Sequence, residues 1–217
     1  MKQLRIISLI CALCLFLSAC ASQQPEDGSS AEPPNTVRIT IPEGASAADI
    51  GGLMEQNGLF TRSEFLAEVN RGNADSPLVQ EIGDWENRAF LLEGYLFPDT
   101  YEFYRDDSPE RVIQKLLDNL EKKITGTQKA RAKEFDMTMD EVLTLASIIQ
   151  AEAGDPAQMK TVSSVLHNRL NSKSHPKLEC DVTIFYLEQE VQPYLTEDKD
   201  RFNSFYNTCL LYTSPSP

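Results

Sequence analysis

The sequence has few of the residues that build disulfide frameworks, metal sites and cationic surfaces. It contains five cysteines and two histidines, and 33 acidic residues against 20 basic ones give a formal charge of -13. A chain of this charge repels polyanions, so we expect no nucleic-acid partner. No H-E-x-x-H, Walker or dinucleotide-binding motif occurs in the 217 residues. We therefore expect no metal and no other cofactor.

The remaining composition is that of a packed domain. Hydrophobic residues make up 41% and charged residues 24% of the chain, which is too apolar for a wholly disordered protein. The length allows one domain of good size or two small ones.

The first 19 residues have the pattern of an export signal. Lys2 and Arg5 precede an apolar run that is too short to span a bilayer comfortably. The end of this run, Leu17-Ser18-Ala19-Cys20, resembles a bacterial lipobox, in which the cysteine thiol is acylated. We therefore expect a lipoprotein anchored through Cys20; the alternative is an ordinary signal peptide with an incidental cysteine.

Residues 20–35 are rich in Pro, Ser, Gln and acidic residues and show no hydrophobic period, which is typical of a solvated tether. We expect the tether to hold a domain at the extracytoplasmic face of the cell membrane. The negative charge would not attract an anionic lipid surface, so the lipid is the expected anchor.

The pattern of apolar and capping residues over 36–77 predicts a small module of one strand and two helices. Alternating apolar residues indicate a strand over 36–41, and Ser46 is suited to cap a helix over 47–57. A second helix is expected after Ser63, with Phe65, Leu66 and Val69 on its apolar face. Such a module cannot bury much surface by itself.

Cap and proline signals over residues 78–208 predict further helices, which follow an aromatic segment. A helix is expected over 110–123 after Ser108-Pro109, and a surface helix over 128–135. Thr138-x-x-Glu141 is a capping box that opens a helix ending near Gly154, and Asp155-Pro156 starts another over 157–170. The predicted fold class is α+β.

Glu152 is the carboxylate with the most unusual predicted position. It lies seven, four and three residues after Leu145, Ile148 and Ile149, so helical geometry places it on the buried or cleft-facing stripe. A carboxyl group there would hold its proton near neutral pH, as a general acid requires. The alternative is a last-turn glutamate that reaches past the rim into water.

Other polar residues have a structural interpretation beside a functional one. Glu93 and Asp99 fit the turn or rim of a buried aromatic hairpin over 85–105. Arg169 suits either a substrate carboxylate or a structural ion pair, and Asp181 suits either a sugar hydroxyl or a turn cap. His167 could act as a base, although a lone helical histidine is more often a surface or core residue.

Several segments together resemble the endolytic murein transglycosylases of the MltG/YceG family. The resemblance spans about residues 36–208 and lies in the opening module, in E-G-x-x-x-P-D-T-Y at Glu93–Tyr101, in L-A-S-I-I-x-x-E at Leu145–Glu152, in N-R-L at Asn168–Leu170 and in L-x-[ST]-D-x-T-x-x-Y at Leu178–Tyr186. Two departures stand out. Gln150 replaces a second acid of many relatives, and Cys180 replaces a hydroxyl residue.

The resemblance implies a LysM-like module (36–77) followed by a mixed helical and β catalytic domain (78–208). It implies Glu152 as the catalytic acid and base, with substrate-binding residues at Glu93, Asp99, Tyr101, Asn168, Arg169, Asp181 and Thr183. The implied activity is cleavage of MurNAc-GlcNAc bonds in nascent peptidoglycan strands with 1,6-anhydro-MurNAc ends, which terminates chain elongation. Peptidoglycan synthases are implied partners. The main alternative is a non-catalytic peptidoglycan-binding lipoprotein.

The end of the chain departs from this pattern. Residues 201–208 are similar to the family's Y-N-[ST]-Y stretch, but residues 209–217, CLLYTSPSP, resemble translated adaptor sequence. We expect a non-native tail there and a catalytic domain that is incomplete at its C-terminus. Cys209 would then be no natural partner for Cys180, although such a bridge is possible on paper.

Overall fold

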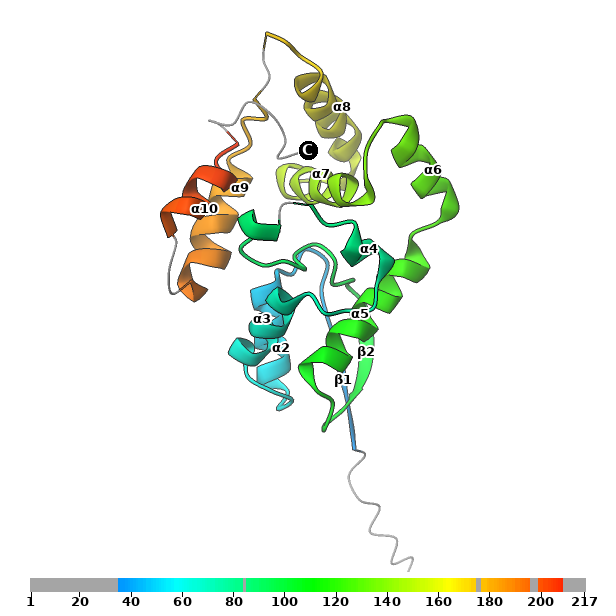
Figure 1. The fold of residues 1–217 in the computed structure, drawn as a ribbon, viewed down its shortest axis with the longest axis vertical. Helices are drawn as coiled ribbons and strands as arrows, with labels where there is room; N and C mark the ends of the chain where they lie inside the picture. Colours follow the sequence, from blue (N-terminus) through cyan, green and yellow to red (C-terminus); the bar gives the residue numbers. More distant parts are fainter. Residues whose placement is uncertain (1–34, 84, 175–176, 196–198, 209–217) are drawn as a thin grey trace, which may run out of the picture. The chain divides into compact units, whose positions relative to one another are not determined.

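The computed structural model describes residues 35–83, 85–174, 177–195 and 199–208 (Figure 1). They belong to one compact unit, Asn35–Pro217. The expected export signal, Cys20, the tether up to residue 34 and the tail 209–217 lie outside the described residues. No helix in the described part of the chain is long and apolar enough to cross a membrane.

The sheet joins two segments that are far apart in the sequence. Strand β1 (Thr36–Thr40) pairs antiparallel with β2 (Thr100–Tyr104), in a register that places Ile39 opposite Tyr101. Both of these side chains are buried, because directly opposite residues of paired strands point to the same face of the sheet. The expected strand near residue 36 is therefore confirmed, and its partner comes from the Glu93–Tyr101 motif region.

Two short helices follow β1, each with a capping box. In α2 (Ala47–Gln56), Ser46 Oγ accepts from the Asp49 N–H, and Asp49 in turn accepts from the Ser46 N–H. The cap of α3 (Arg62–Arg71) is Thr61, paired with Glu64. The predicted cap at Ser63 is wrong because the Thr61–Glu64 capping box satisfies the first N–H groups of the helix two residues earlier.

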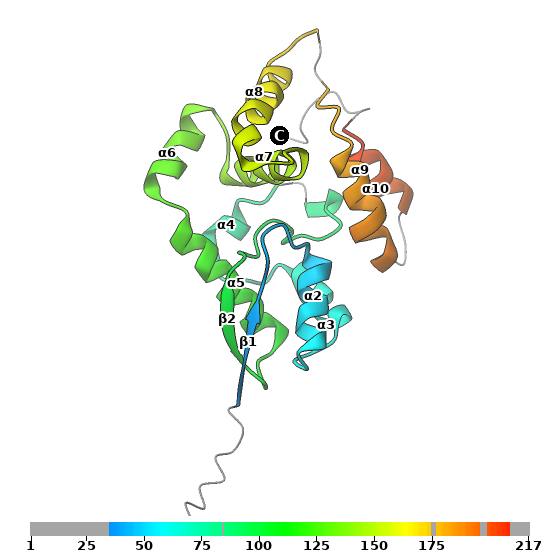
Figure 2. The same cartoon turned by 180° about the vertical axis from the view of Figure 1, so that it is seen from behind.

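The middle of the chain supplies short turns and two longer helices. Helices α4 (Pro77–Gln80) and η1 (Trp85–Asn87) precede β2. The expected helix near residues 110–123 is α5 (Pro109–Lys123), which buries an apolar stripe, and α6 (Gly126–Glu134) is largely exposed as expected. The Lys115 ammonium lies 5.4 Å from the Phe103 ring centroid of β2, so α5 lies beside the sheet (Figures 1 and 2).

The last third is almost entirely helical. It contains α7 (Met139–Glu152), η2 (Pro156–Gln158), α8 (Met159–Leu170), α9 (Val182–Tyr186), the π-helical turn η3 (Leu187–Val191), η4 (Gln192–Tyr194) and α10 (Lys199–Tyr206). Thr138 and Glu141 form the predicted capping box of α7. Asp155 caps the short η2 through the Ala157 N–H, so α8 begins two residues after the expected start.

The buried side chains form two hydrophobic clusters. The larger one joins β1, β2, α2, α3, α5 and the start of α7 with residues of η3 and α10. The smaller one lies between α7 and α8 and contains Leu145, Ile148, Leu166, Leu178 and Cys180. The described architecture is thus α+β, mostly helical with a two-stranded sheet, and the smaller cluster forms the base of the site described next.

Candidate active site

A pocket of about 250 Å³ lies over the small cluster between α7 and α8. Its lining combines two carboxylates, one guanidinium and an apolar wall: Glu152, Glu179, Arg169, Val162, Val165 and Leu166. Two of the residues predicted from the sequence, Glu152 and Arg169, therefore line one pocket. Such a mixture of charged and apolar groups suits a ligand with a polar reacting centre.

Helix α7, which carries Glu152, is fixed at its other end by a buried ion pair. Asp140 is 7% exposed and accepts two bonds from Arg88 Nη2, at 2.5 and 2.6 Å. The Tyr95 hydroxyl donates to the same carboxylate at 2.7 Å. Burial and this bond to Asp140 raise the pKa of Tyr95 far above its usual range, so its hydroxyl remains a donor. The ion pair ties α7 to the segment before β2.

Glu152 is the last residue of α7, and its side chain is exposed. It faces the pocket, as the cleft-facing interpretation expects, but it is not buried. The sequence argument for a buried carboxyl group is wrong on this point because the helix ends at Glu152, and the following turn, capped by Asp155, does not cover it. The carboxylate is instead accessible to a ligand in the pocket.

Arg169 is held by the segment that precedes α9. One Nη donates to the Leu178 carbonyl oxygen, and the other lies 3.8 Å from Glu179 Oε2. Glu179 has a left-handed backbone with φ 53°, which is uncommon for a residue with a Cβ. Asn168 is exposed and does not line the pocket.

Cys180 lines the pocket and is held by hydrogen bonds with Thr183 and Thr208, which lie behind it. Thr183 Oγ1 donates to the Cys180 carbonyl oxygen at 2.9 Å and lies 3.2 Å from Thr208 Oγ1. Thr208 Oγ1 accepts from the Cys180 N–H at 3.1 Å. The structure thus gives Thr183 a supporting position. Asp181 is exposed and precedes α9, where its carbonyl oxygen accepts from the Ile184 and Phe185 N–H groups.

The Glu93 side chain contacts the N-terminus of α2 and does not line the pocket that contains Glu152. Its two carboxylate oxygens accept from the Ala47 N–H, each at 3.1 Å, and one accepts from the Tyr186 hydroxyl at 2.8 Å. Burial raises the pKa of the Glu93 carboxyl group, and these two bonds oppose the shift. Glu93 therefore joins α2 to α9.

Asp99 and Tyr101 share a different partner, Asn119 of α5. The Asn119 amide donates to Asp99 Oδ2 at 3.1 Å and to the Tyr101 hydroxyl oxygen at 2.8 Å. The Thr100 N–H and the Asn119 amide lower the pKa of Asp99, whereas burial raises the pKa of Tyr101. Both residues stabilise the start of β2 and neither lines the pocket beside Glu152.

Three features of the site have no signal in the sequence. No motif marks the left-handed Glu179, and nothing in the sequence marks Val165, which is 44% exposed and lines the pocket. His167 stacks on Phe135 with 5.3 Å between ring centroids instead of lining the pocket. Among the described residues, no group of three His, Cys, Asp or Glu side chains is arranged to hold a metal.

Known proteins resemble this chain along most of its length. The sequence profile of the YceG-like family matches residues 23–214. The endolytic murein transglycosylase of Bacillus subtilis (strain 168) is 28% identical over 79% of this chain and 49% of its own length. The enzyme of that name from Streptococcus pneumoniae (strain D39) is 30% identical over 75% of this chain and 32% of its own length.

The crystal structure of a YceG-like protein from Listeria monocytogenes superposes with a TM-score of 0.63 at 25% identity, over 82% of this chain and 61% of that one. The chain thus spans about half or less of the length of the curated relatives that it matches. Because the family profile matches most of its residues, the chain belongs to the YceG-like family.

Proposed function

We propose that the protein is an endolytic lytic transglycosylase that cleaves MurNAc-GlcNAc bonds of peptidoglycan. The observation that carries the proposal is the position of Glu152, a carboxylate at the end of α7 that opens into a pocket shared with Arg169. The relatives named endolytic murein transglycosylase support the same chemistry.

One carboxylate is sufficient for this reaction because the substrate carries its own nucleophile. Glu152 donates its proton to the oxygen that links MurNAc C1 to GlcNAc, and this C–O bond breaks as oxocarbenium character develops at C1. The C6 hydroxyl of the same MurNAc attacks C1 and gives its proton to the Glu152 carboxylate. The products are a 1,6-anhydro-MurNAc end and a new GlcNAc hydroxyl. The intramolecular hydroxyl competes well with water because it is already positioned.

The pocket supplies two further contributions. The Arg169 guanidinium holds an oxygen of the substrate, and the exposed Val165 contacts an apolar face of a sugar ring. Because Glu152 is exposed, the bound saccharide itself excludes water from the carboxylate during the reaction. Asn168 and Asp181 are exposed and adjoin the lining residues Arg169 and Cys180 in the sequence, and they contact more distant parts of the strand.

The proposal extends to the location and partners of the protein. Cys20 carries the lipid anchor, so the enzyme works at the extracytoplasmic face of the membrane, where nascent strands leave their synthases. Residues 36–77 act as a LysM-like module that aligns the strand. Cleavage at this place terminates chain elongation.

Mass spectrometry of glycan strands tests the reaction. The purified full chain in detergent should release fragments with 1,6-anhydro-MurNAc ends, and Glu152→Gln should lower their yield by at least about a hundredfold. Glu134→Gln, which changes an exposed glutamate of α6, is the matched control and should retain activity. Reducing ends would identify a hydrolase, and bound but uncut strands would identify a binding protein.

A further inference from the structure

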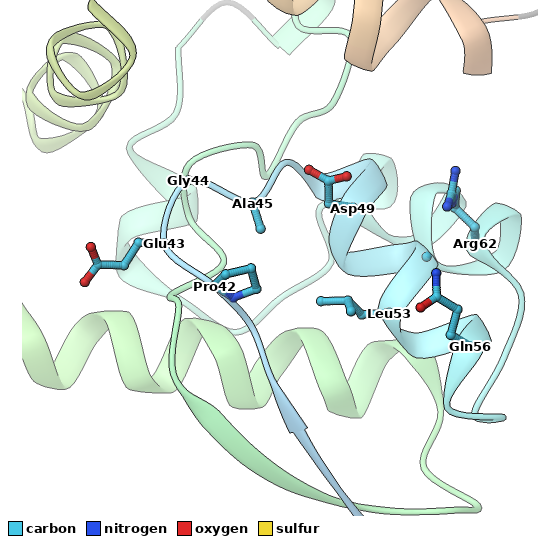
Figure 3. A pocket seen from close by; sticks show the side chains of 9 residues that line it. Pro42, Glu43, Gly44, Ala45, Asp49, Leu53, Gln56 and Arg62 are labelled. Atoms are coloured by element: carbon cyan, nitrogen blue, oxygen red, sulfur yellow. The ribbon is translucent and has the colours of Figure 1, made fainter. Parts of the chain in front are cut away.

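A second groove, of about 390 Å³, lies against α2 in the N-terminal part of the described chain (Figure 3). It is formed by the loop 42–45, one face of α2 and the first residue of α3. Its polar lining includes Asp49, Gln56 and Arg62, and its apolar lining includes Pro42 and Leu53. Nothing in the proposed cleavage reaction uses these side chains.

Arg62 supplies the only positive charge among the residues that line the groove. The Glu43 carboxylate turns away from the other labelled side chains in Figure 3. Asp49 accepts from the Ser46 N–H at 3.1 Å, as part of the capping box of α2. Arg62 forms no ion pair with any residue in the described ranges, so its charge is available to a ligand.

The position of Arg62 is built by two neighbours. Gly52 lets its side chain cross α2, because a Cβ at position 52 would overlap the Arg62 Nη2 atom. On the other side, Nη1 donates to the Tyr194 hydroxyl, and the guanidinium carbon lies 5.2 Å from the Tyr194 ring centroid. The Nε atom is buried and has no hydrogen-bond partner among the described residues. A buried unpaired donor of this kind is costly and calls for a role.

The groove lies close to the end of α7. The loop residue Gly44, which lines the groove, would place a Cβ 3.6 Å from Gln150 Nε2. Gln150 belongs to the last turn of α7, two residues before Glu152. The groove and the Glu152 pocket therefore flank the same helix end, and one extended ligand can reach both.

We infer that this groove is a subsite for a carboxylate of the peptide stem on the strand that Glu152 cleaves. The inference rests on the proposed function. A guanidinium binds a carboxylate through two parallel N–H donors. Asp49 and Gln56 accept amide or hydroxyl hydrogens of the same ligand, and Leu53 supports its apolar part. The Asp49 charge favours a ligand that carries donors beside its carboxylate, as a peptide attached to a sugar does.

Calorimetry with a soluble disaccharide-tetrapeptide tests the subsite without requiring cleavage. The full chain should bind this ligand roughly tenfold more tightly than the same ligand with its carboxyl groups converted to carboxamides. Arg62→Gln should abolish this preference. Arg71→Gln, which changes an exposed arginine of the same helix, should preserve it.

Tyr194→Phe separates binding from support of the fold, because it removes the hydroxyl that Arg62 contacts and leaves the guanidinium in place. The preference should survive in this variant. Three results would overturn the inference. The wild-type chain could bind the carboxylate and carboxamide ligands equally, Arg62→Gln could keep the preference for the carboxylate, or Tyr194→Phe could lose that preference as fully as Arg62→Gln is expected to. Anhydro-end formation is measured separately, so preference without cleavage would refute the proposed function and leave the subsite standing.

Discussion

Arg88 Nη2 lies 2.5 Å from Asp140 Oδ1, and both side chains are at most 15% exposed. This pair connects the loop before β2 with the first turn of α7, the helix that ends at Glu152. The Gly83 N–H, at 3.4 Å, and the Tyr95 hydroxyl also donate to Asp140. The helix that carries Glu152 at one end is therefore anchored by a buried charge at the other end.

Asp140→Asn should destabilise the fold strongly because it leaves the Arg88 charge buried without its partner. We expect a loss of about 3 kcal/mol in the free energy of unfolding, measured by urea denaturation. Glu68→Gln removes the ion pair with Arg71, whose side chain is 64% exposed, and should cost less than about 1 kcal/mol. Equal losses in the two variants would contradict the importance assigned to the buried pair.

The longer helices up to α8 were predictable because their signals are local. The Ser46 cap, the Thr138–Glu141 capping box and the apolar stripe of α5 could be read from the sequence, since each depends on residues three or four apart. The cap at Thr61 has the same T-x-x-E pattern as Thr138, so the start of α3 is also encoded locally.

The site was predictable only in part because its geometry depends on long-range packing. Glu152 and Arg169 were identified through motifs, and they line one pocket. The motif residues Asp99, Tyr101 and Thr183 instead bond to Asn119 or Cys180, contacts that no spacing in the sequence reveals. Likewise, the exposure of Glu152 depends on where the chain turns after α7, and periodicity alone does not determine this.

The Glu93 carboxyl group should make stability depend on pH. Burial raises its folded-state pKa above the ordinary value of 4.5, and the neighbouring Glu190 raises it further, while the Ala47 N–H and the Tyr186 hydroxyl lower it. The folded state then binds the proton more tightly than the unfolded state. The contribution to stability is therefore complete below pH 4.5 and is lost as pH rises through the folded-state pKa.

Glu93→Gln removes this titration while keeping an acceptor for the Ala47 N–H. Urea denaturation between pH 4 and 8 should show the wild type losing stability relative to Glu93→Gln as pH rises. Asp99→Asn is an informative comparison because the pKa of that exposed carboxyl group is lowered from 3.8, so its contribution to stability is lost only as pH falls through the folded-state pKa and should give no matching loss between pH 4 and 8. A difference between wild type and Glu93→Gln that stays constant with pH would contradict the assignment.

The left-handed backbone of Glu179 allows its effect on stability to be measured apart from the effect of its charge. Glu179→Asn and Glu179→Ala both remove the exposed carboxylate that lies 3.8 Å from Arg169. Asparagine tolerates φ 53° better than alanine does, since its short side chain bonds locally. The Asn variant should therefore be more stable than the Ala variant by about 0.5–1 kcal/mol in thermal denaturation. If both variants unfold at the same temperature, the backbone at position 179 is not strained, and the orientation of the pocket wall depends on the Thr208 contacts to Glu179 and Cys180 alone.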